Sequence, residues 1–214
     1  MRERPLTARG NARLDTLVRT AAELFLERGY EAVSLDDLIA RAGGSRRNIY
    51  DHLGGKEGLF IEATTQLCRE LSEPLEALDI RGNDIRAALA LFGRQLLDAV
   101  LQPRAIGLHR LMIAEGQRFP HLAQAVWQAG HGNAARILSE PIEAWQTEAR
   151  ISRDVPAAVL AEQFINLVVA GPQLSVLIGL QTLPLTPDAI VRQVEQAVII
   201  FTKGIVPEKG HPHA

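Results

Sequence analysis

The chain has 214 residues, of which 47% are hydrophobic and only 5% aromatic. This length can bury a substantial core, and the abundance of Leu, Ala and Ile favours a helical protein and argues against a sheet protein or a disordered chain. The net charge is -2, and the single cysteine, Cys68, excludes an internal disulfide, so we expect a reducing, cytoplasmic location.

The charge is unevenly distributed along the chain. Residues 1–13 hold four arginines against one acid, so the overall balance does not exclude a nucleic-acid partner. The same stretch lacks the apolar run of a signal peptide, and the most apolar segment, residues 155–180, carries several polar side chains. Neither export nor membrane insertion is therefore expected.

A first helix is predicted near the N-terminus and a second, shorter one after it. Apolar residues recur at helical spacing from Leu14 onward, and Gly29 is a natural stop for this first helix. Ser34 followed by Asp37 resembles a capping box, in which the hydroxyl and the carboxylate satisfy backbone donors at a helix start. The second helix is expected to end at Gly43.

A third helix follows a glycine-containing turn. Ser45 can cap it, and it runs to His52 before Gly54 and Gly55 break it. Two short helices joined by such a turn describe a helix-turn-helix. A longer helix is predicted from Lys56, and the remainder reads as further helices without repeats or hairpin signals.

One segment, Gly29 to Leu59 with the sequence GYEAVSLDDLIARAGGSRRNIYDHLGGKEGL, resembles the DNA-binding signature of the TetR family of transcriptional regulators. It shares the Gly-aromatic opening, the Ala-Gly-x-Ser turn at residues 42–45, Tyr50 and the Lys56-Glu57 pair. The resemblance covers about the first 60 residues. Three positions depart from the family pattern and bear on the operator sequence more than on the fold: Gly44, Asn48 and Leu53.

This resemblance implies an all-α fold of about nine helices. A three-helix helix-turn-helix DNA-binding domain would occupy residues 1–55, and a helical effector-binding and dimerisation domain residues 56–214. It further implies a homodimeric regulator that binds double-stranded operator DNA. Members of the family usually repress transcription, so we expect a repressor that a small, apolar ligand releases from a palindromic operator. The alternative is a DNA-binding regulator without a small-molecule switch, either constitutive or controlled by a protein partner.

The third helix carries the residues that suit DNA recognition. Side chains at the N-terminal end of a helix in the major groove reach base edges, and arginine can bond guanine, and asparagine adenine, at two points each. Arg46, Arg47 and Asn48 stand at that end. Phosphate contacts are expected from Tyr50, His52 and Lys56, and the predicted DNA-binding set is completed by Ser34 and Ser45 at the helix starts.

Two alternatives remain open at this point. Arg46 and Arg47 would be solvated surface charges, and Tyr50 would fill the three-helix core, if the helix served structure alone. Likewise Arg9 and Arg13 either reach a neighbouring groove or phosphate, or belong to a disordered basic tail.

Two long apolar segments, residues 155–180 and 187–205, are expected to form the dimer interface. Such a pair would leave apolar surface exposed on a monomer, and pairing it with its copy gives a four-helix, two-fold interface that places two recognition helices. The residues predicted there are Val176, Ile190, Val194, Ala197, Val198 and Phe201. The other interpretation packs the same stripe within one chain.

Residues 110–127, RLMIAEGQRFPHLAQAVW, resemble the C-terminal half of AefR-like members of the family. An effector cavity is expected between the helix from Lys56 and the dimer helices, apolar with a few polar groups. Its candidate residues, each of which would otherwise be ordinary core, are Phe92, Leu96, His109, Met112, Ile113, Trp127, His131, Trp145 and Phe164.

No catalytic or cofactor motif is recognisable. The chain lacks a HExxH pair, a GxxxxGK phosphate loop and a GxSxG elbow, and a second cysteine for a metal site is missing. His211 and His213 make a poor metal site beside the closed ligand sets of real ones. We therefore expect neither an enzyme nor a bound metal or cofactor.

Overall fold

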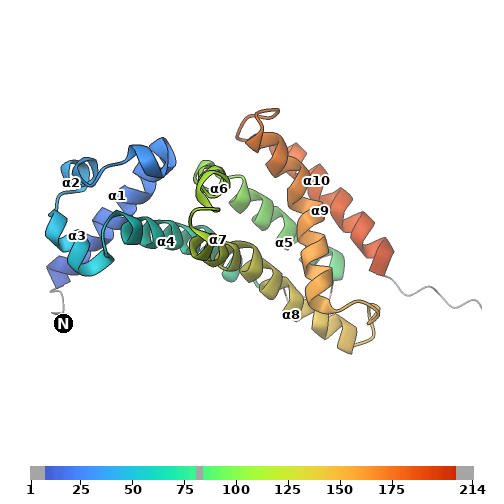
Figure 1. Ribbon diagram of the computed structural model, residues 1–214. Helices are drawn as coiled ribbons and strands as arrows, with labels where there is room; N and C mark the ends of the chain where they lie inside the picture. The colour runs from blue at the N-terminus through green and yellow to red at the C-terminus, as the bar shows by residue number, and fades with distance from the viewer. Residues whose placement is uncertain (1–7, 81–83, 206–214) are drawn as a thin grey trace, which may run out of the picture. The chain divides into compact units, whose positions relative to one another are not determined.

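The computed structural model describes residues 8–80 and 84–205, and in this part of the chain all regular structure is helical (Figure 1). The helices are α1 (Ala8–Ala32), α2 (Leu35–Ala42), α3 (Arg46–Leu53), α4 (Lys56–Glu76), α5 (Ile85–Val100), α6 (Pro103–Glu115), α7 (Pro120–Trp127), the π-helical turn η1 (Gln128–Gly132), α8 (Asn133–Thr147), α9 (Ala157–Leu177) and α10 (Pro187–Ile205). Since α7, η1 and α8 follow without a break, counting them as one leaves nine helices. The predicted all-α fold is confirmed.

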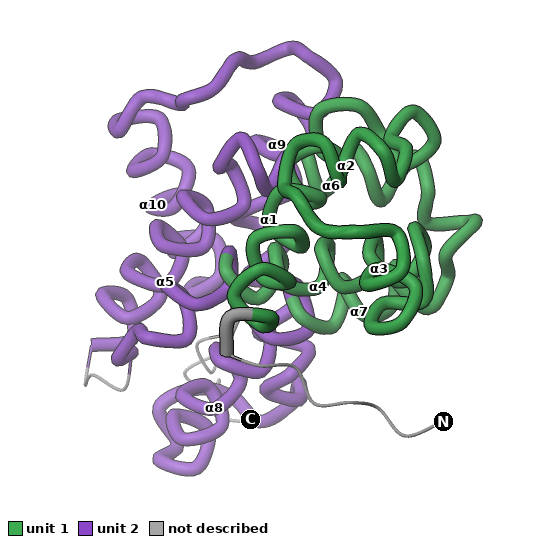
Figure 2. The backbone as a smooth tube through the Cα atoms, turned by 90° about the vertical axis from the view of Figure 1, so that its left-hand side faces the viewer, with its two compact units in different colours: residues 1–70, 107–129 green, residues 71–106, 130–214 purple. Residues whose placement is uncertain are grey.

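The chain divides into two compact units, and it passes between them three times (Figure 2). Unit 1 combines the chain up to residue 70 with residues 107–129, and unit 2 combines residues 71–106 with the chain from residue 130 onward. The domain boundary predicted after residue 55 does not coincide with the division into compact units, since the first stretch of unit 1 ends at residue 70. The division into a DNA-binding and an effector-binding domain stays a prediction. Unit 1 holds the complete helix-turn-helix, the first part of α4, and α7.

In unit 1, α1 supplies the expected apolar stripe. Leu17, Ala21, Leu24 and Phe25 are buried, at the spacing that places them on one face. Gly29 has φ 78° and ψ 170°, so the helical path breaks there as predicted, although the segment up to Ala32 is still part of α1. This break requires a residue that tolerates positive φ.

An aromatic cluster of Phe25, Tyr30, Phe60 and Phe119 ties three segments of unit 1 together. The ring of Tyr30 lies 4.7 Å from that of Phe60 and 4.9 Å from that of Phe119, measured between centroids. Phe119, which precedes α7, also lies 5.4 Å from Phe60 on α4. Because such pairs add to the burial of large rings, this cluster fixes the segment before α7 against α1 and α4.

Unit 2 is built on α5, α8, α9 and α10, which share one hydrophobic core. Phe92 of α5, Phe164 of α9 and Phe201 of α10 meet in it, and the rings of Phe164 and Phe201 lie 5.2 Å apart. Gly93 allows close approach of α5 and α10, because a Cβ built there would lie 2.9 Å from Val194 Cγ1. This core is therefore formed by side chains of a single chain.

Within the described residues, α9 is the one helix long and apolar enough to cross a membrane by length and composition. One such helix is weak support for insertion, because core helices of soluble proteins pass the same test. One face of α9 is buried in unit 2 through Leu160, Phe164 and Val168, while Leu167 and Leu174 are exposed. The helix thus has two apolar faces, of which only one is covered.

Candidate nucleic-acid interface

The predicted capping box at the start of α2 is present. The backbone N–H of Asp37 donates to Ser34 Oγ at 3.1 Å, and the backbone N–H of Ser34 donates to Asp37 Oδ2 at 2.9 Å. These reciprocal bonds satisfy two donors that a helix start leaves unpaired. The Ser34 hydroxyl, which donates to Asp37 Oδ2, and then the Ser34 backbone N–H hold the pKa of Asp37 below its ordinary value of 3.8, because both bonds favour the charged carboxylate.

The turn between α2 and α3 depends on two glycines. Gly43 has φ 75° and Gly44 has φ 110°, both in a region that side chains with a Cβ avoid. Ser45 then caps α3, since its Oγ accepts from the N–H of Asn48 at 3.2 Å. At the other end, Gly54 is left-handed with φ 73° and ends the helix. Both ends of α3 are therefore where the sequence predicts them.

Helix α3 is anchored on one side and exposed on the other. Ile49 is fully buried, whereas Arg46, Arg47, Asn48 and His52 are exposed. This is the arrangement that a helix needs to enter a groove while the protein holds its other face.

Tyr50 lies on the exposed side of α3. Its side chain is 60% exposed, which contradicts the alternative interpretation that it fills the three-helix core. Its ring lies close to Gly55, because a Cβ built on Gly55 would approach Tyr50 Cε1 to 2.9 Å. A glycine after α3 thus leaves room for the tyrosine to lie flat at the surface.

Lys56, at the start of α4, is half-buried and partly engaged. Its Nζ donates to the backbone oxygen of Glu31 at 3.3 Å and lies 4.3 Å from the centroid of the Tyr30 ring. Burial lowers the pKa of this ammonium group from its ordinary value. Arg118 forms an ion pair with Glu31 and also lies over the Tyr30 ring, at 5.1 Å. The position of Lys56 is thus coupled to the segment before α7.

Both arginines of α3 are paired with acids. Arg46 forms a two-point ion pair with Asp36 of α2, with Arg46 Nε donating to Asp36 Oδ1 at 3.0 Å. Arg47 Nε donates to Asp51 Oδ2 at 3.4 Å, one helical turn along α3. The bond from Arg46 holds the pKa of Asp36 below its ordinary value. Sequence reasoning missed Asp36, because no periodic pattern relates it to Arg46 on another helix.

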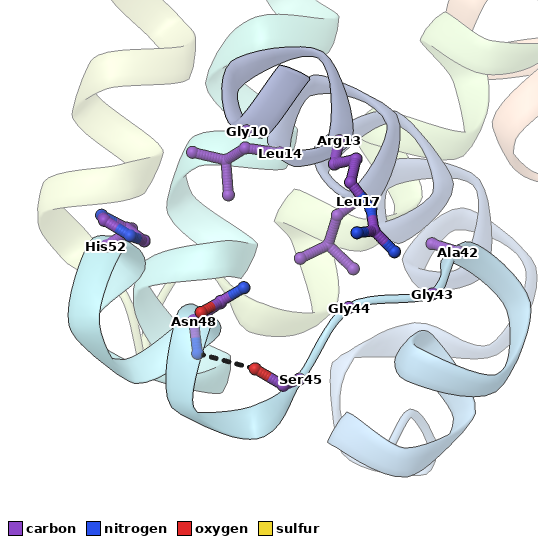
Figure 3. A pocket seen from close by; sticks show the side chains of 10 residues that line it. All are labelled: Gly10, Arg13, Leu14, Leu17, Ala42, Gly43, Gly44, Ser45, Asn48 and His52. Atoms are coloured by element: carbon purple, nitrogen blue, oxygen red, sulfur yellow. Dashed lines mark hydrogen bonds between the residues drawn. The ribbon is translucent and has the colours of Figure 1, made fainter. Parts of the chain in front are cut away.

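A surface hollow of about 390 Å³ lies beside α3 (Figure 3). Figure 3 shows Arg13 of α1 and Asn48 and His52 of α3 around it, with Gly43 and Gly44 forming one edge. No side chain projects from Gly44, where an apolar residue is usual in the family. The hollow is therefore open next to the predicted base-reading end of α3. Arg9 lies outside the residues whose side chains are described.

The predicted cavity residues are divided between the two units. Phe92, Leu96, Trp145 and Phe164 are buried in the core of unit 2. His131 also belongs to unit 2, and burial lowers its pKa below the ordinary 6.5, so it is neutral at pH 7. The remaining four belong to unit 1, where Ile113 is 71% exposed: His109, Met112, Ile113 and Trp127. The effector cavity stays a prediction.

The residues predicted for the dimer interface lie in or against the core of the same chain, and their part in a dimer stays a prediction. All six pack into or against the core of the same chain: Val176, Ile190, Val194, Ala197, Val198 and Phe201. Five of them are buried and Ile190 is partly buried, so most of this stripe is covered by α5, α9 and α10 of the same chain. The apolar residues that remain exposed on α9 and α10 are Val159, Leu167, Leu174, Ile178, Val191, Ile199 and Ile200.

Two family models match the chain, and together they cover most of it. Residues 17–63 match the model described as bacterial regulatory proteins, tetR family, and residues 87–204 match the C-terminal domain of AefR-like transcriptional repressors. The second model alone spans more than half of the chain. The chain belongs to the TetR family of transcriptional regulators, a class of proteins that are not enzymes, and its C-terminal part is of the AefR-like type.

Known proteins resemble the chain over different lengths. The Flavonoid-responsive Regulator FrrA has a TM-score of 0.79 and 28% identity, covering 92% of this chain and 99% of its own. A TetR-family regulator from Mesorhizobium loti has a TM-score of 0.83 at 18% identity, covering 94% and 100% of the two chains, and shows the fold alone.

Among curated relatives, the HTH-type transcriptional regulator YezE of Bacillus subtilis is 28% identical over 52% of this chain and 58% of its own length. An HTH-type transcriptional repressor of Mycobacterium tuberculosis is 30% identical over 50% of this chain and 54% of its own length. The match thus spans little more than half the length of these relatives.

The capping box predicts a pH-dependent contribution to stability. Because folding lowers the pKa of Asp37, its stabilisation is complete above the ordinary value of 3.8 and is lost as the pH falls through the folded-state value. Asp37→Asn should therefore destabilise the protein at neutral pH, and the gap between variant and wild type should shrink below pH 3.8.

Urea unfolding at a series of pH values measures this gap. Asp15→Asn, which removes an exposed carboxylate from α1, serves as the control and should leave stability nearly unchanged at neutral pH. A gap that stays constant down to the lowest pH would show that the charge of Asp37 does not carry the effect.

Proposed function

We propose that this chain is a repressor that binds a palindromic operator as a homodimer and leaves it when a small effector binds. The observation that carries the proposal is the exposed, capped N-terminal end of α3, where Arg46, Arg47 and Asn48 project while Ile49 anchors the opposite face. An α-helix presented in this way fits the major groove of B-DNA. We expect the protein to act in the cytoplasm, where its operator is accessible.

The proposed roles divide the exposed residues by chemistry. Arg46, Arg47 and Asn48 read base edges, because guanidinium and amide groups can form two-point bonds with purines. Tyr50, His52 and Lys56 contact the phosphate backbone, Lys56 with the help of the unpaired amides at the start of α4. Two hydroxyls act as helix caps at the edge of the same surface: Ser34 and Ser45.

Two substitutions separate base reading from phosphate binding. Arg46→Ala should weaken binding to the selected operator and relax the preference at one base pair, by about 1–3 kcal/mol of discrimination. Lys56→Ala should weaken binding to all sequences alike and reduce the slope of log K against log salt by about 0.9. Selection from a random duplex pool, followed by titrations at several salt concentrations, measures both.

The exposed Arg136 on α8 supplies the charge control, since Arg136→Ala removes a cation from unit 2. It should change neither the selected sequence nor the salt slope. Enrichment of no sequence by the wild-type protein at low salt would contradict the proposed DNA-binding function itself.

The proposed homodimer uses the uncovered faces of α9 and α10. Leu167 and Leu174 share one side of α9, Ile178 follows directly after the helix, and Ile199 is exposed on α10. Large apolar side chains left exposed on two helices that contact each other indicate a candidate interface between chains. A two-fold dimer would also supply two copies of α3, as a palindromic operator requires.

Leu174→Glu tests this surface. The side chain is 57% exposed within one chain, so the substitution should leave the monomer folded. Burying the new charge between two chains would be costly, and the dimer should therefore dissociate, with loss of operator binding. Sedimentation velocity and operator titration measure both effects. Ile113→Glu, at a position 71% exposed in unit 1, is the control and should stay dimeric. An unchanged dimer in Leu174→Glu would rule out this face.

The proposed effector is a small, largely aromatic compound. FrrA, similar to this chain over nearly its whole length, is named as flavonoid-responsive, and unit 2 holds aromatic side chains at its core. A ligand releases DNA only if it binds the DNA-free conformation more tightly. Flavonoids and other apolar compounds should therefore include one that stabilises the free protein against heat and displaces it from its operator.

A ligand at 100 times its Kd adds about 2.7 kcal/mol of stability, which a thermal shift detects readily. Displacement of labelled operator by the same compound supplies the second measurement. If no compound in a broad panel stabilises the protein, the regulator without a small-molecule switch becomes the favoured function.

A further inference from the structure

Asp36 and Arg46 form the most directional ion pair on the proposed DNA-facing surface. Arg46 donates to both oxygens of the carboxylate, with Nε to Oδ1 at 3.0 Å and Nη2 to Oδ2. The two residues come from different helices, α2 and α3, on either side of the turn. Both side chains are largely exposed, so a role in holding the fold together is minor.

The geometry of the pair leaves a specific set of donors unused. A guanidinium group has five N–H donors in one plane, and the carboxylate takes the edge formed by Nε and Nη2. The opposite end, formed by the remaining hydrogens of Nη1 and Nη2, stays available. That end presents two parallel donors, which match the O6 and N7 acceptors of guanine.

We propose that Asp36 is a positioning residue that sets the specificity of DNA binding, by holding the Arg46 guanidinium so that its free end meets a guanine. The inference rests on the proposed DNA-binding function. Asp36 acts through Arg46 and touches no base. Its charge also neutralises that of Arg46, which reduces the attraction to phosphates of any sequence.

Arg47, on the same helix, lacks a two-point bond to a carboxylate on another helix within the described part of the chain. Its one bond to Asp51, at 3.4 Å, joins residues one turn apart on the same helix and leaves the guanidinium free to rotate. Single contacts of this type in solvent contribute little to orientation. Arg46, fixed at two points from a second helix, is therefore the base reader whose orientation the protein prepares in advance.

The test compares Asp36→Asn with a matched control. Glu27→Gln removes an acid from another exposed ion pair in unit 1, that of Arg41 and Glu27 at 3.1 Å, and changes the net charge by the same amount. For each variant, the selected sequence is determined from a random duplex pool. Affinities are then measured for the best site, for that site with each base pair replaced, and for an unrelated duplex.

Asp36→Asn should reduce the preference at the base pair read by Arg46 by about tenfold, while affinity for the unrelated duplex rises. Glu27→Gln should leave the preference at every base pair unchanged. In an Arg46→Ala background, Asp36→Asn should cause no further loss at that base pair, because its effect passes through Arg46. Thermal unfolding of Asp36→Asn should resemble that of Glu27→Gln, since each loses one exposed ion pair, which separates positioning from folding.

Three results would overturn the inference. If Asp36→Asn keeps the full preference, Arg46 needs no positioning. If Asp36→Asn still changes the preference in the Arg46→Ala background, Asp36 contacts DNA directly. If the wild-type protein selects no sequence, the proposed function fails and this inference fails with it, an outcome distinct from a wild type that selects a site and a variant that retains it.

Discussion

The burial of one side chain of α3, Ile49, is the constraint on which the proposed DNA-facing surface depends. A helix of eight residues is too short to be stable alone in water, so it exists because tertiary packing holds it. Ile49 is fully buried and fixes one face, and Ser45 and Gly54 close the two ends. With the helix held in this way, the polar residues around Arg46 are not needed for packing and stay exposed, where they can contact a ligand.

The aromatic cluster of unit 1 extends this constraint to a distant part of the sequence. Tyr30 contacts Phe60 and Phe119, and it also lies beneath Lys56 and Arg118. The segment before α7 therefore shares one rigid set of rings with the start of α4. Movement of that segment would change the surroundings of Lys56, because Arg118 and Lys56 both lie over the same ring. The cluster is thus a physical connection between the two stretches of chain that form unit 1.

The local features of this fold could be predicted from the sequence, whereas the contacts between helices could not. Ser34, Ser45 and Gly54 act within three or four residues of themselves, and the structure places each where its chemistry predicts. The pair of Asp36 and Arg46 spans ten positions and two helices, so it depends on the crossing of α2 and α3. Periodicity also does not show that Gly132 and its neighbours continue the helix from α7 to α8, since the π-helical turn follows no common pattern.

The burial of the stripe predicted for the dimer interface has the same physical origin. Helix α10 carries apolar side chains on more than one face, with Val194 and Phe201 buried and Ile199 and Ile200 exposed. A pattern of this width indicates that a helix is covered on several sides, but it does not say which side is covered by its own chain. The fold decides this, because α5 approaches α10 closely at Gly93. The side that α5 does not cover is then the one proposed to meet a second chain.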